Sequence, residues 1–433
     1  MNKLKIAIAG LGTVGASVIN YIEHNKKTLE KRINTKIEII GICAKEKSKK
    51  RSFKIDKYTW YSNPISMINS CKPNIYIELM GYEKGISYKS IIHAINNRIA
   101  VITANKALLS IHGNYIFKLA EKNNVKILFE ASVAGGIPVI KVIKDSLSGN
   151  KITKISAILN GTTNYILSNM HINKISFKKA FQEAQKKGYV ESNPALDIEG
   201  IDSAHKLSIL STLSFNSKFI KFDKIYREGI SKIEKIDIDY SKKLNLVIKL
   251  LSIVQEIKNK LILYVKPVMI SNKSQLSKVN GVLNGIQINS SELGSLFLEG
   301  KGAGGAATAS SIISDINEFC INRDNKSLSI NFKELTNKDI ISLDSNKSSY
   351  YIRMIVKDKE GVLAKVTSLF KKNKISIESL IQNPENNDIT KSFIPLIFIT
   401  HETTYKNIKN SIGKIKKLKD IKDNPIVIQI DRV

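Results

Sequence analysis

The sequence predicts an α/β protein built from three parts, and the spacing of apolar runs along the chain indicates each part. Residues 1–149 alternate short apolar runs with amphipathic ones, which predicts strands separated by helices and hence a parallel sheet. Residues 150–302 hold fewer and more widely spaced elements, typical of a mixed α+β domain. Residues 323–349 are rich in Lys, Asn and Ser, which predicts a linker. Residues 350–433 follow the order β-α-β-β-α-β of a ferredoxin-like domain.

The individual elements are predicted from the same apolar runs and their periodicity. In the first part, strands are expected at KIAIAG, KIEIIGIC, NIYIEL, IAVIT and VKILFE, with helices after the first strand and around 88–97 and 107–122. In the second part, KISAIL and KLILYVKPVMI predict strands, and 177–187 and 202–213 predict helices. A helix at 303–322 follows a glycine-rich stretch and is expected to rejoin the first part. In the last part, YYIRMIVKD, ISIESLIQN, IPLIFITH and PIVIQID predict strands, and GVLAKVTSLFKKN and YKNIKNSIGKIKKL predict helices.

Composition and charge exclude several classes of protein. The 433 residues are 42% hydrophobic and 24% charged with 8 Pro, so every part of the chain is expected to fold. No run approaches the roughly 18 apolar residues of a membrane helix, and the start of the chain lacks a signal-peptide pattern, so we expect a cytoplasmic protein without a membrane partner. The net charge of +30 comes mostly from scattered Lys, which argues against a nucleic-acid partner. Cys43, Cys71 and Cys320 form no metal or redox motif and are expected to be buried, unoxidised thiols.

A glycine motif links the first predicted strand to the first helix. Gly10, Gly12 and Gly15 form GxGxxG directly after the strand KIAIA. In this position the first glycine makes a tight turn, the second lets the backbone approach a pyrophosphate, and the third lets helix and strand pack closely. The phosphates would lie at the positive end of the helix. The motif therefore predicts a Rossmann-type dinucleotide-binding domain.

Two lysines follow other strands of this domain. Lys45 follows the second strand, where a cation suits the 2′-phosphate of NADP and an acidic residue would suit the ribose of NAD. Lys106 follows the fourth strand, at the edge where ligands bind in open α/β sheets. An ordinary solvated lysine is the alternative at both positions. The sequence favours NADP and leaves NAD open.

The densest cluster of charged residues lies at 188–207, in GYVESNPALDIEGIDSAHKL. A helix is expected from Ile201 onward, so Asp202 and Lys206 are four residues apart on one face. Reduction of an aldehyde by hydride leaves an alkoxide that needs a proton, and a lysine ammonium held by carboxylates can supply it. A capped surface helix with a routine ion pair is the alternative. His205 points to another side of the helix and is expected to be structural.

A glycine turn at 129–138, FEASVAGGIP, ends the fifth predicted strand. Its backbone carbonyls, together with the one carboxylate of Glu130, suit a hard cation. From the residues alone, a plain turn between strand and helix is the alternative.

Together these motifs resemble homoserine dehydrogenase, and the resemblance runs through essentially the whole chain. It is carried by GLGTVG, TANKALL, FEASVAGGIP, LNGTTNYIL, GKGAGGAATAS and above all GYVESNPALDIEGIDSAHKL. Residues 350–433 resemble an ACT domain, an amino-acid-sensing module. The resemblance implies reversible NAD(P)H-dependent reduction of L-aspartate 4-semialdehyde to L-homoserine in threonine, methionine and isoleucine biosynthesis, with feedback by threonine. It also implies a homodimer or homotetramer whose dimer contact lies in the second part.

The resemblance further implies a role for particular residues. Lys206 would be the catalytic proton donor, and Lys106 a second catalytic lysine beside the nicotinamide. Glu191 would bind the amino group of homoserine, while Asp197 and Asp202 would orient the substrate and Lys206. The cofactor-binding positions match Gly10, Gly12, Thr13, Val14, Gly15, Lys45, Thr103, Lys106 and Gly302. A sodium site matches Glu130, Val133, Gly135 and Ile137, the last three through backbone carbonyls.

Four positions depart from the family pattern. Lys45 stands where Arg is common, which keeps the charge but loses the bidentate fork for a phosphate. Tyr82 stands where Gly is common and Lys301 where Pro is common, which leaves the geometry of the loops near the cofactor open. In the ACT part, the turn before Gly361 lacks the usual Pro, which leaves effector binding open.

The alternative function is a regulatory ACT protein whose Rossmann part senses the cofactor without turnover. The chain keeps all the acidic and basic residues that turnover would use, namely Glu191, Asp197, Asp202, Lys106 and Lys206. A sensor has no need of them, so the sequence favours an enzyme.

Overall fold

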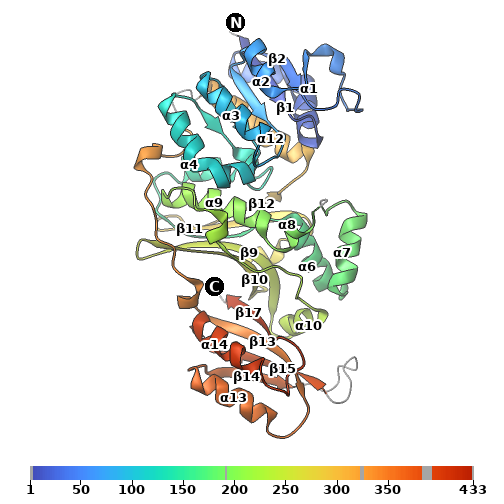
Figure 1. The fold of residues 1–433 in the computed structure, drawn as a ribbon, viewed down its shortest axis with the longest axis vertical. Coiled ribbons are helices and arrows are strands. Elements are labelled where there is room, and N and C mark those ends of the chain that lie inside the picture. The colour runs from blue at the N-terminus through green and yellow to red at the C-terminus, as the bar shows by residue number, and fades with distance from the viewer. Residues whose placement is uncertain (1–2, 191–192, 322–325, 383–392, 432–433) are drawn as a thin grey trace.

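The computed structural model describes residues 3–190, 193–321, 326–382 and 393–431. The described chain is elongated (Figure 1), with an N-terminal domain at one end, a C-terminal domain at the other and a middle domain between them. The domains follow one another in the order of the sequence, apart from one helix that returns to the first domain.

A parallel sheet forms the N-terminal domain. Its strands run in the order β3-β2-β1-β4-β5-β6, and β1 pairs with β2 on one side and with β4 on the other. The chain order reverses between β1 and β4, and the crevice at such a point is where open α/β sheets bind ligands. This strand order agrees with the predicted Rossmann-type fold. The elements are β1 (Lys3–Ala9), α1 (Thr13–Ile33), β2 (Lys36–Cys43), β3 (Trp60–Tyr61), α2 (Pro64–Cys71), β4 (Ile75–Glu78), α3 (Ile86–Asn96), β5 (Ala100–Thr103), α4 (Lys106–Lys122) and β6 (Ile127–Leu128).

Helix α12 (Gly305–Ile321) packs on the N-terminal domain although it follows the middle domain in sequence. Its Ile312 and Ile316 share one buried core with Val18 and Ile22 of α1. In Figure 1, α12 lies among the elements of the N-terminal domain. The chain therefore passes between the N-terminal and middle domains twice, once before and once after the middle domain in the sequence.

The middle domain is a mixed layer of helices on a largely antiparallel sheet. Its elements are α5 (Val139–Lys141), β7 (Ile152–Ile158), α6 (Gly161–Asn173), α7 (Phe177–Lys186), α8 (Ala195–Ile198), α9 (Ile201–Phe215), β8 (Tyr226–Arg227), α10 (Lys235–Lys243), β9 (Leu246–Ile257), β10 (Lys260–Ser271), α11 (Gln275–Lys278), β11 (Leu283–Ser290) and β12 (Gly294–Lys301). The strands of this domain run in the order β12-β11-β7-β9-β10. A single turn of π-helix at 142–146 follows α5.

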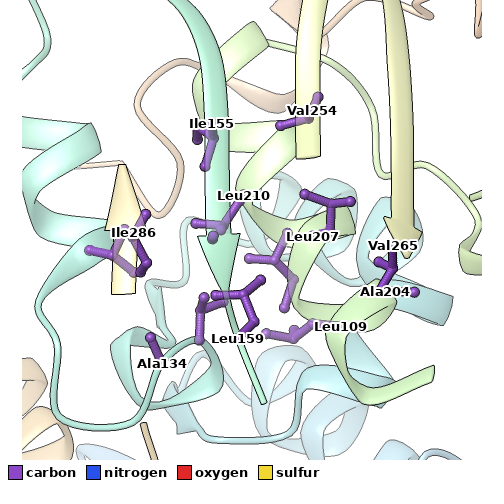
Figure 2. Close-up of a cluster of buried hydrophobic side chains, with 14 of the residues drawn as sticks. Leu109, Ala134, Ile155, Leu159, Ala204, Leu207, Leu210, Val254, Val265 and Ile286 are labelled. Carbon is purple, nitrogen blue, oxygen red and sulfur yellow. The ribbon is translucent and has the colours of Figure 1, made fainter. Parts of the chain in front are cut away.

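The apolar face of α9 anchors this helix on the sheet. Figure 2 shows Ala204, Leu207 and Leu210 of α9 directed toward side chains of the strands and of α4, which are Leu109, Ile155, Val254, Val265 and Ile286. Burial of these apolar side chains is the main force that holds α9 in place. The helix that carries Asp202 and Lys206 is therefore fixed on a rigid support.

The C-terminal domain continues the sheet of the middle domain. Its elements are β13 (Lys347–Lys357), α13 (Val362–Lys372), β14 (Ile377–Gln382), β15 (Phe393–Thr400), β16 (Thr403–Thr404), α14 (Tyr405–Ile415) and β17 (Ile426–Asp431). Strand β17 pairs in parallel with β10, so the order β12-β11-β7-β9-β10 runs on into β17-β13-β15-β14. The predicted β-α-β-β-α-β order is present, with the short β16 added.

The described part of the predicted linker packs first on the N-terminal domain, where the backbone N–H of Ile127 donates to the hydroxyl of Ser327 at 2.8 Å, and then on the middle domain. Its apolar residues Leu328, Phe332, Leu335 and Leu343 are buried. Single β-bridges join Thr336 to Ser217 and Ile340 to Leu261. This stretch is thus an ordered connection rather than an extended tether.

Two smaller expectations concern the thiols and the membrane. Cys43 is buried, as expected, but Cys71 and Cys320 are only half-buried, so the expectation of burial is wrong for these two. Cys71 ends α2 and Cys320 lies near the end of α12, and both pack against the cores without being covered completely. Within the described ranges, no helix is long and apolar enough to cross a membrane.

Candidate active site

Lys206 lies on α9 with its ammonium group held by two oxygens. Its Nζ donates to Oδ2 of Asp202 at 2.6 Å and to the carbonyl of Leu159 at 2.7 Å. The side chain is 10% exposed. Asp202 and Lys206 are one helical turn apart, as the sequence predicts, and the strand end at Leu159 closes the other side.

Asp202 connects Lys206 to a second lysine from the other domain. Nζ of Lys106, at the start of α4, lies 3.2 Å from Oδ1 of Asp202. Burial by itself raises the pKa of Asp202, but the two ammonium groups outweigh burial and lower the pKa below its ordinary value. The carboxylate is therefore ionised near neutral pH and holds one lysine with each oxygen.

Asn160 was not predicted from the sequence, yet it bridges two of the predicted carboxylates. Its amide nitrogen donates to Oδ1 of Asp197 at 2.7 Å and to Oδ2 of Asp202 at 3.2 Å. Its amide oxygen accepts from the backbone N–H of Thr163 and so caps α6. An asparagine between a strand and GTT in LNGTT indicates a helix cap, but the cap alone does not reveal the bridge.

The structure brings together most, but not all, of the predicted substrate residues. Asp197, Asp202, Lys106 and Lys206 form one connected cluster through Asn160 and Asp202. Glu191 lies outside the described residues. His205 is buried, with its ring 4.5 Å from that of Phe222, in keeping with a structural role.

The glycine motif at the end of β1 is shaped by close backbone contacts. Gly10 has φ +97°, and a Cβ there would lie 2.3 Å from the carbonyl carbon of Leu79. A Cβ on Gly15 would lie 2.0 Å from the carbonyl oxygen of Gly10. A Cβ on Gly12, in contrast, would meet nothing within 4 Å among the described residues. Gly10 and Gly15 are needed for the fold, and Gly12 borders open space.

Thr13 and Val14 open α1 beside this loop. In the described structure no side chain caps the start of α1, so its first N–H groups receive no hydrogen bond from a capping side chain. Such a helix start suits a phosphate, because the uncapped N–H groups and the helix dipole both favour an anion. The residues present therefore fit the pyrophosphate of a dinucleotide.

Thr103, at the end of β5, belongs to a buried network beside the same edge of the sheet. Its hydroxyl donates to Oε2 of Glu78 at 2.8 Å and accepts from the backbone N–H of Asn105 at 3.0 Å. Burial raises the pKa of Glu78. Thr103 thus positions the turn that leads into Lys106, whatever contact it makes with a cofactor.

Lys45 and Tyr82 meet across the crevice after β2 and β4. Nζ of Lys45 lies 5.3 Å from the ring centre of Tyr82, within the range of a cation–π contact. Tyr82 is 53% exposed, and its carbonyl accepts from the amide of Asn105 at 2.8 Å. The tyrosine at this position, unusual for the family pattern, is therefore a partner of Lys45.

The turn at 133–137 meets the second glycine loop of the chain. A Cβ on Gly135, which has φ +55°, would lie 2.5 Å from the carbonyl oxygen of Gly302. The backbone N–H of Gly136 donates to the carbonyl of Lys301 at 3.0 Å. Lys301 contributes its backbone carbonyl, rather than its side chain, to this contact.

Glu130 is buried in the same region, and both of its carboxylate oxygens are engaged. They accept from the backbone N–H groups of Ile140 at 2.8 Å and Lys141 at 2.9 Å. Burial raises the pKa of Glu130 to about 7. The carbonyl of Gly135 accepts from the hydroxyl of Ser311 at 2.6 Å. The turn offers oxygen ligands, but the carboxylate is turned toward the start of α5.

Comparison with known proteins agrees with this geometry. Family models described as the NAD-binding domain of homoserine dehydrogenase, as homoserine dehydrogenase and as an ACT domain match residues 10–130, 138–316 and 350–420. A homoserine dehydrogenase of Neisseria gonorrhoeae is 35% identical, over 99% of this chain and 98% of its own length.

Solved structures give the same result. A homoserine dehydrogenase from Thiobacillus denitrificans matches 100% of this chain and 99% of its own, with a TM-score of 0.91 and 30% identity. A hyperthermophilic archaeal homoserine dehydrogenase in complex with NADPH matches 73% of this chain and 97% of its own, with a TM-score of 0.63 and 29% identity. The predicted resemblance and fold class are confirmed, and a sensor without turnover is not favoured. The chain therefore belongs to the homoserine dehydrogenase family of NAD(P)-dependent oxidoreductases and ends in an ACT domain.

Proposed function

We propose that the cluster of Lys106, Asp197, Asp202 and Lys206 carries out the reversible reduction of L-aspartate 4-semialdehyde to L-homoserine. The observation that supports this proposal most strongly is the double contact of Asp202, which holds lysines from two domains at 2.6 and 3.2 Å. A site that closes between the dinucleotide domain and the middle domain suits a reaction between a cofactor and a small substrate.

In this proposal Lys206 moves the proton of the reaction. A nicotinamide, when bound, would supply the hydride for C4 of the aldehyde. Nζ of Lys206 would pass its proton to the carbonyl oxygen, which gives the alcohol. The carboxylate of Asp202 holds the ammonium group of Lys206 at 2.6 Å before transfer. The carbonyl of Leu159 fixes the direction of the ammonium group. In the reverse reaction the same amine takes the proton from the hydroxyl.

The other polar residues of the cluster would bind and orient the substrate. Lys106 would face the reacting end from the side of the nicotinamide, and Asp197 would contribute an acidic group to the pocket of the amino-acid end. Glu191 is proposed as a ligand of the α-ammonium group, by resemblance alone. Asn160 would hold the two aspartates in register.

We propose that the cofactor is NADP in preference to NAD. Lys45 supports this because its ammonium group lies in the crevice after β2, where a 2′-phosphate would be placed. Tyr82 would restrain Lys45 through the cation–π contact. The phosphates would be surrounded by the two glycine loops, which would close over them. The residues concerned are Gly10, Gly12, Thr13, Val14, Gly15 and Gly302.

A sodium ion is proposed for the turn at 130–137. The ligands would include the backbone carbonyls of Val133, Gly135 and Ile137. Glu130 would add a carboxylate oxygen, through a lone pair other than those that accept from the backbone N–H groups of α5. A rise in melting temperature with NaCl that equimolar LiCl fails to reproduce would support the site. Equal shifts with both salts would argue against it.

We also propose that threonine regulates the enzyme through the ACT domain and that the protein forms a homodimer or homotetramer. The proposed limits are 1–149 together with the helix 303–322 for the dinucleotide-binding domain, 150–302 for the middle domain and 350–433 for the ACT domain. Titration of threonine against the full chain should lower the rate of homoserine oxidation, whereas glycine should not. No response to threonine at any concentration would contradict this regulation.

The function is tested by the absorbance of the reduced cofactor. Purified full-length protein with NADPH should consume it when L-aspartate 4-semialdehyde is added, and should produce it from NADP and L-homoserine. Parallel assays with NADH give the cofactor preference. Protein that consumes neither NADPH nor NADH would overturn the proposal.

A further inference from the structure

Lys266 of β10 is a buried lysine at the junction of the middle and C-terminal domains. It is 3% exposed, and its ammonium group lies 5.2, 5.8 and 4.9 Å from the ring centres of Tyr264, Tyr350 and Tyr405. Tyr350 and Tyr405 belong to β13 and α14 of the C-terminal domain. Burial of a charge is costly unless neighbouring groups compensate it, and tyrosine faces do so in part.

Glu228 supplies the negative charge beside this lysine. Burial lowers the pKa of Lys266 to about 8, and attraction to Glu228 opposes that change. The hydroxyl of Tyr226 lies 3.4 Å from Oε2 of Glu228 and 2.9 Å from the hydroxyl of Tyr405. A hydrogen-bonded pair of tyrosines thus joins the C-terminal domain to Glu228. The Lys266 cluster is defined here as Tyr226, Glu228, Tyr264, Lys266, Tyr350 and Tyr405.

The residue before Lys266 on the strand is buried against the turn that precedes α9. Side chains alternate along a strand, so Val265 and Lys266 point to opposite faces of the sheet. The backbone of Gly200 packs so closely on Val265 that a Cβ there would lie 2.9 Å from Cγ1 of Val265. Figure 2 shows Val265 next to Ala204 of α9. Gly200 immediately precedes α9, which carries Asp202 in its first turn.

A second connection runs through the backbone after β8. The backbone N–H of Glu228 donates to the carbonyl of Val265 at 2.9 Å, and that of Ile230 donates to the carbonyl of Ile198 at 3.1 Å. Gly229 lies between Glu228 and Ile230 and packs against the carbonyl of Ile198. A Cβ on Gly229 would lie 2.5 Å from that carbonyl oxygen. Ile198 follows Asp197 directly. The segment that carries Glu228 therefore also bounds the acidic turn of the active site.

We propose that Lys266 is a positioning residue through which the C-terminal domain sets the place of Asp197 and Asp202. Contacts of Lys266 with the rings of Tyr350 and Tyr405 hold β10, and the hydroxyl of Tyr405 holds the segment after β8 through Tyr226 and Glu228. These two backbones hold the turn at 198–200. The inference rests on the proposed substrate roles of the two aspartates. The glycine motif and Lys45 lie in the other domain and take no part in these contacts.

The test compares three variants of the full chain in homoserine oxidation. Lys266→Met removes the charge and keeps much of the side-chain length. Tyr405→Phe removes the hydroxyl that reaches Tyr226 and keeps the ring over Lys266. Tyr350→Phe is the matched control, because the Tyr350 hydroxyl is buried without a hydrogen-bond partner among the described residues.

The expected result is a change in KM for homoserine that leaves KM for the dinucleotide unaltered. Lys266→Met should raise KM for homoserine by about fivefold, and Tyr405→Phe should raise it less, while KM for the dinucleotide stays at its wild-type value. Tyr350→Phe should change neither. A purely structural role would reduce the fraction of active protein, which lowers kcat and leaves both KM values unchanged.

Two outcomes would overturn the inference. One is an unchanged KM for homoserine in folded Lys266→Met, checked by its melting curve. The other, decisive if Lys266→Met fails to fold, is that Tyr405→Phe and Tyr350→Phe behave alike. If the wild-type protein oxidises no homoserine at all, the proposed function fails instead, so the two failures are distinguishable.

Discussion

Asp202 lies between two ammonium groups that reach it from two different domains. Lys206 is its neighbour on the same helix, and the sequence predicts that contact from the spacing of four residues. Lys106 comes from another domain, and no local pattern predicts its distance from Asp202. Its position after a strand indicated only the ligand-binding edge of the sheet, and the resemblance to a family placed it beside the nicotinamide. The structure gives its contact with Asp202 at 3.2 Å.

Asn160 shows why part of the site could not be predicted. From the sequence it fits a helix cap, and the structure has that cap on α6. Its bridge to Asp197 and Asp202 depends on how α6 and α9 are placed on the sheet, which is a long-range property. A residue that satisfies a local rule gives no local indication of a second role.

Replacement of Asn160 by serine separates these two roles. Serine also caps helices, so Asn160→Ser should keep α6 stable and lose both bonds to the aspartates. Hydrogen bonds to charged groups contribute enough that kcat/KM for homoserine should fall about tenfold or more. The same change at Asn63, which caps α2, is the control and should leave kcat/KM unchanged. Equal kinetics for the two variants would remove Asn160 from the site.

At the scale of elements, the strand–turn–helix unit at β1 and α1 was the most predictable feature. Its glycine spacing gave both the fold and the expected ligand, because each glycine answers a separate steric requirement. In the structure Gly10 and Gly15 contact backbone atoms, whereas Gly12 borders open space. The roles of the glycines can therefore be separated by experiment.

The loop should respond differently at its second and third glycines. Gly12→Ala should weaken NADPH binding by about tenfold, since the added methyl group enters the space for the phosphates, and should leave the melting temperature unchanged. Gly15→Ala should lower the free energy of unfolding by about 1–3 kcal/mol, because its Cβ would overlap the Gly10 carbonyl. Fluorescence titration of NADPH and thermal unfolding provide the two readouts. Wild-type affinity in Gly12→Ala would contradict this placement of the cofactor.

Strand β9 carries a buried lysine that gives a pH dependence of stability. Lys249 is 1% exposed, and its Nζ donates to Oδ1 of Asn164 at 3.0 Å and to the carbonyl of Val279. Burial lowers its pKa from the ordinary 10.5 to about 8. Between these values the unfolded chain binds the proton and the folded chain does not, so the free energy of unfolding rises with pH.

The free energy of unfolding should rise by up to about 1.4 kcal/mol for each pH unit between 8 and 10.5, and this rise should disappear in Lys249→Met. Urea unfolding of both proteins at pH 8 and at pH 10 measures it, and the difference between the two proteins isolates Lys249 from other titrating groups. Parallel pH dependences for wild type and variant would show that Lys249 keeps its proton on folding.

At the scale of the molecule, the C-terminal domain is joined to the middle domain by strand pairing and by a buried ion pair. Its internal order was predictable, because short apolar runs mark its strands. The pairing of β17 with β10 was not predictable, since the match between two strands far apart in sequence is decided by tertiary packing. The junction also holds Arg353, whose Nε and Nη2 donate to the two oxygens of Asp237 at 2.7 and 3.1 Å.

Loss of one partner of this pair should destabilise the whole chain. Arg353→Met leaves the fully buried carboxylate of Asp237 without its cation, which should lower the free energy of unfolding by about 3–5 kcal/mol. Adding Asp237→Leu should recover much of the loss, because the unpaired charge is then removed as well. Denaturant unfolding of the two single variants and the double variant forms the cycle. Additive losses would mean that the pair contributes no coupling between the domains.

The central claim is that Lys206 exchanges the proton of the reaction in a cluster built around Asp202. The most direct measurement is the rate of homoserine oxidation by Lys206→Ala, with Lys178→Ala on the exposed face of α7 as the control. The account predicts that kcat falls by about 10² or more in Lys206→Ala, with NADPH binding retained and the control unaffected. A Lys206→Ala protein that oxidises homoserine at the wild-type rate would contradict it.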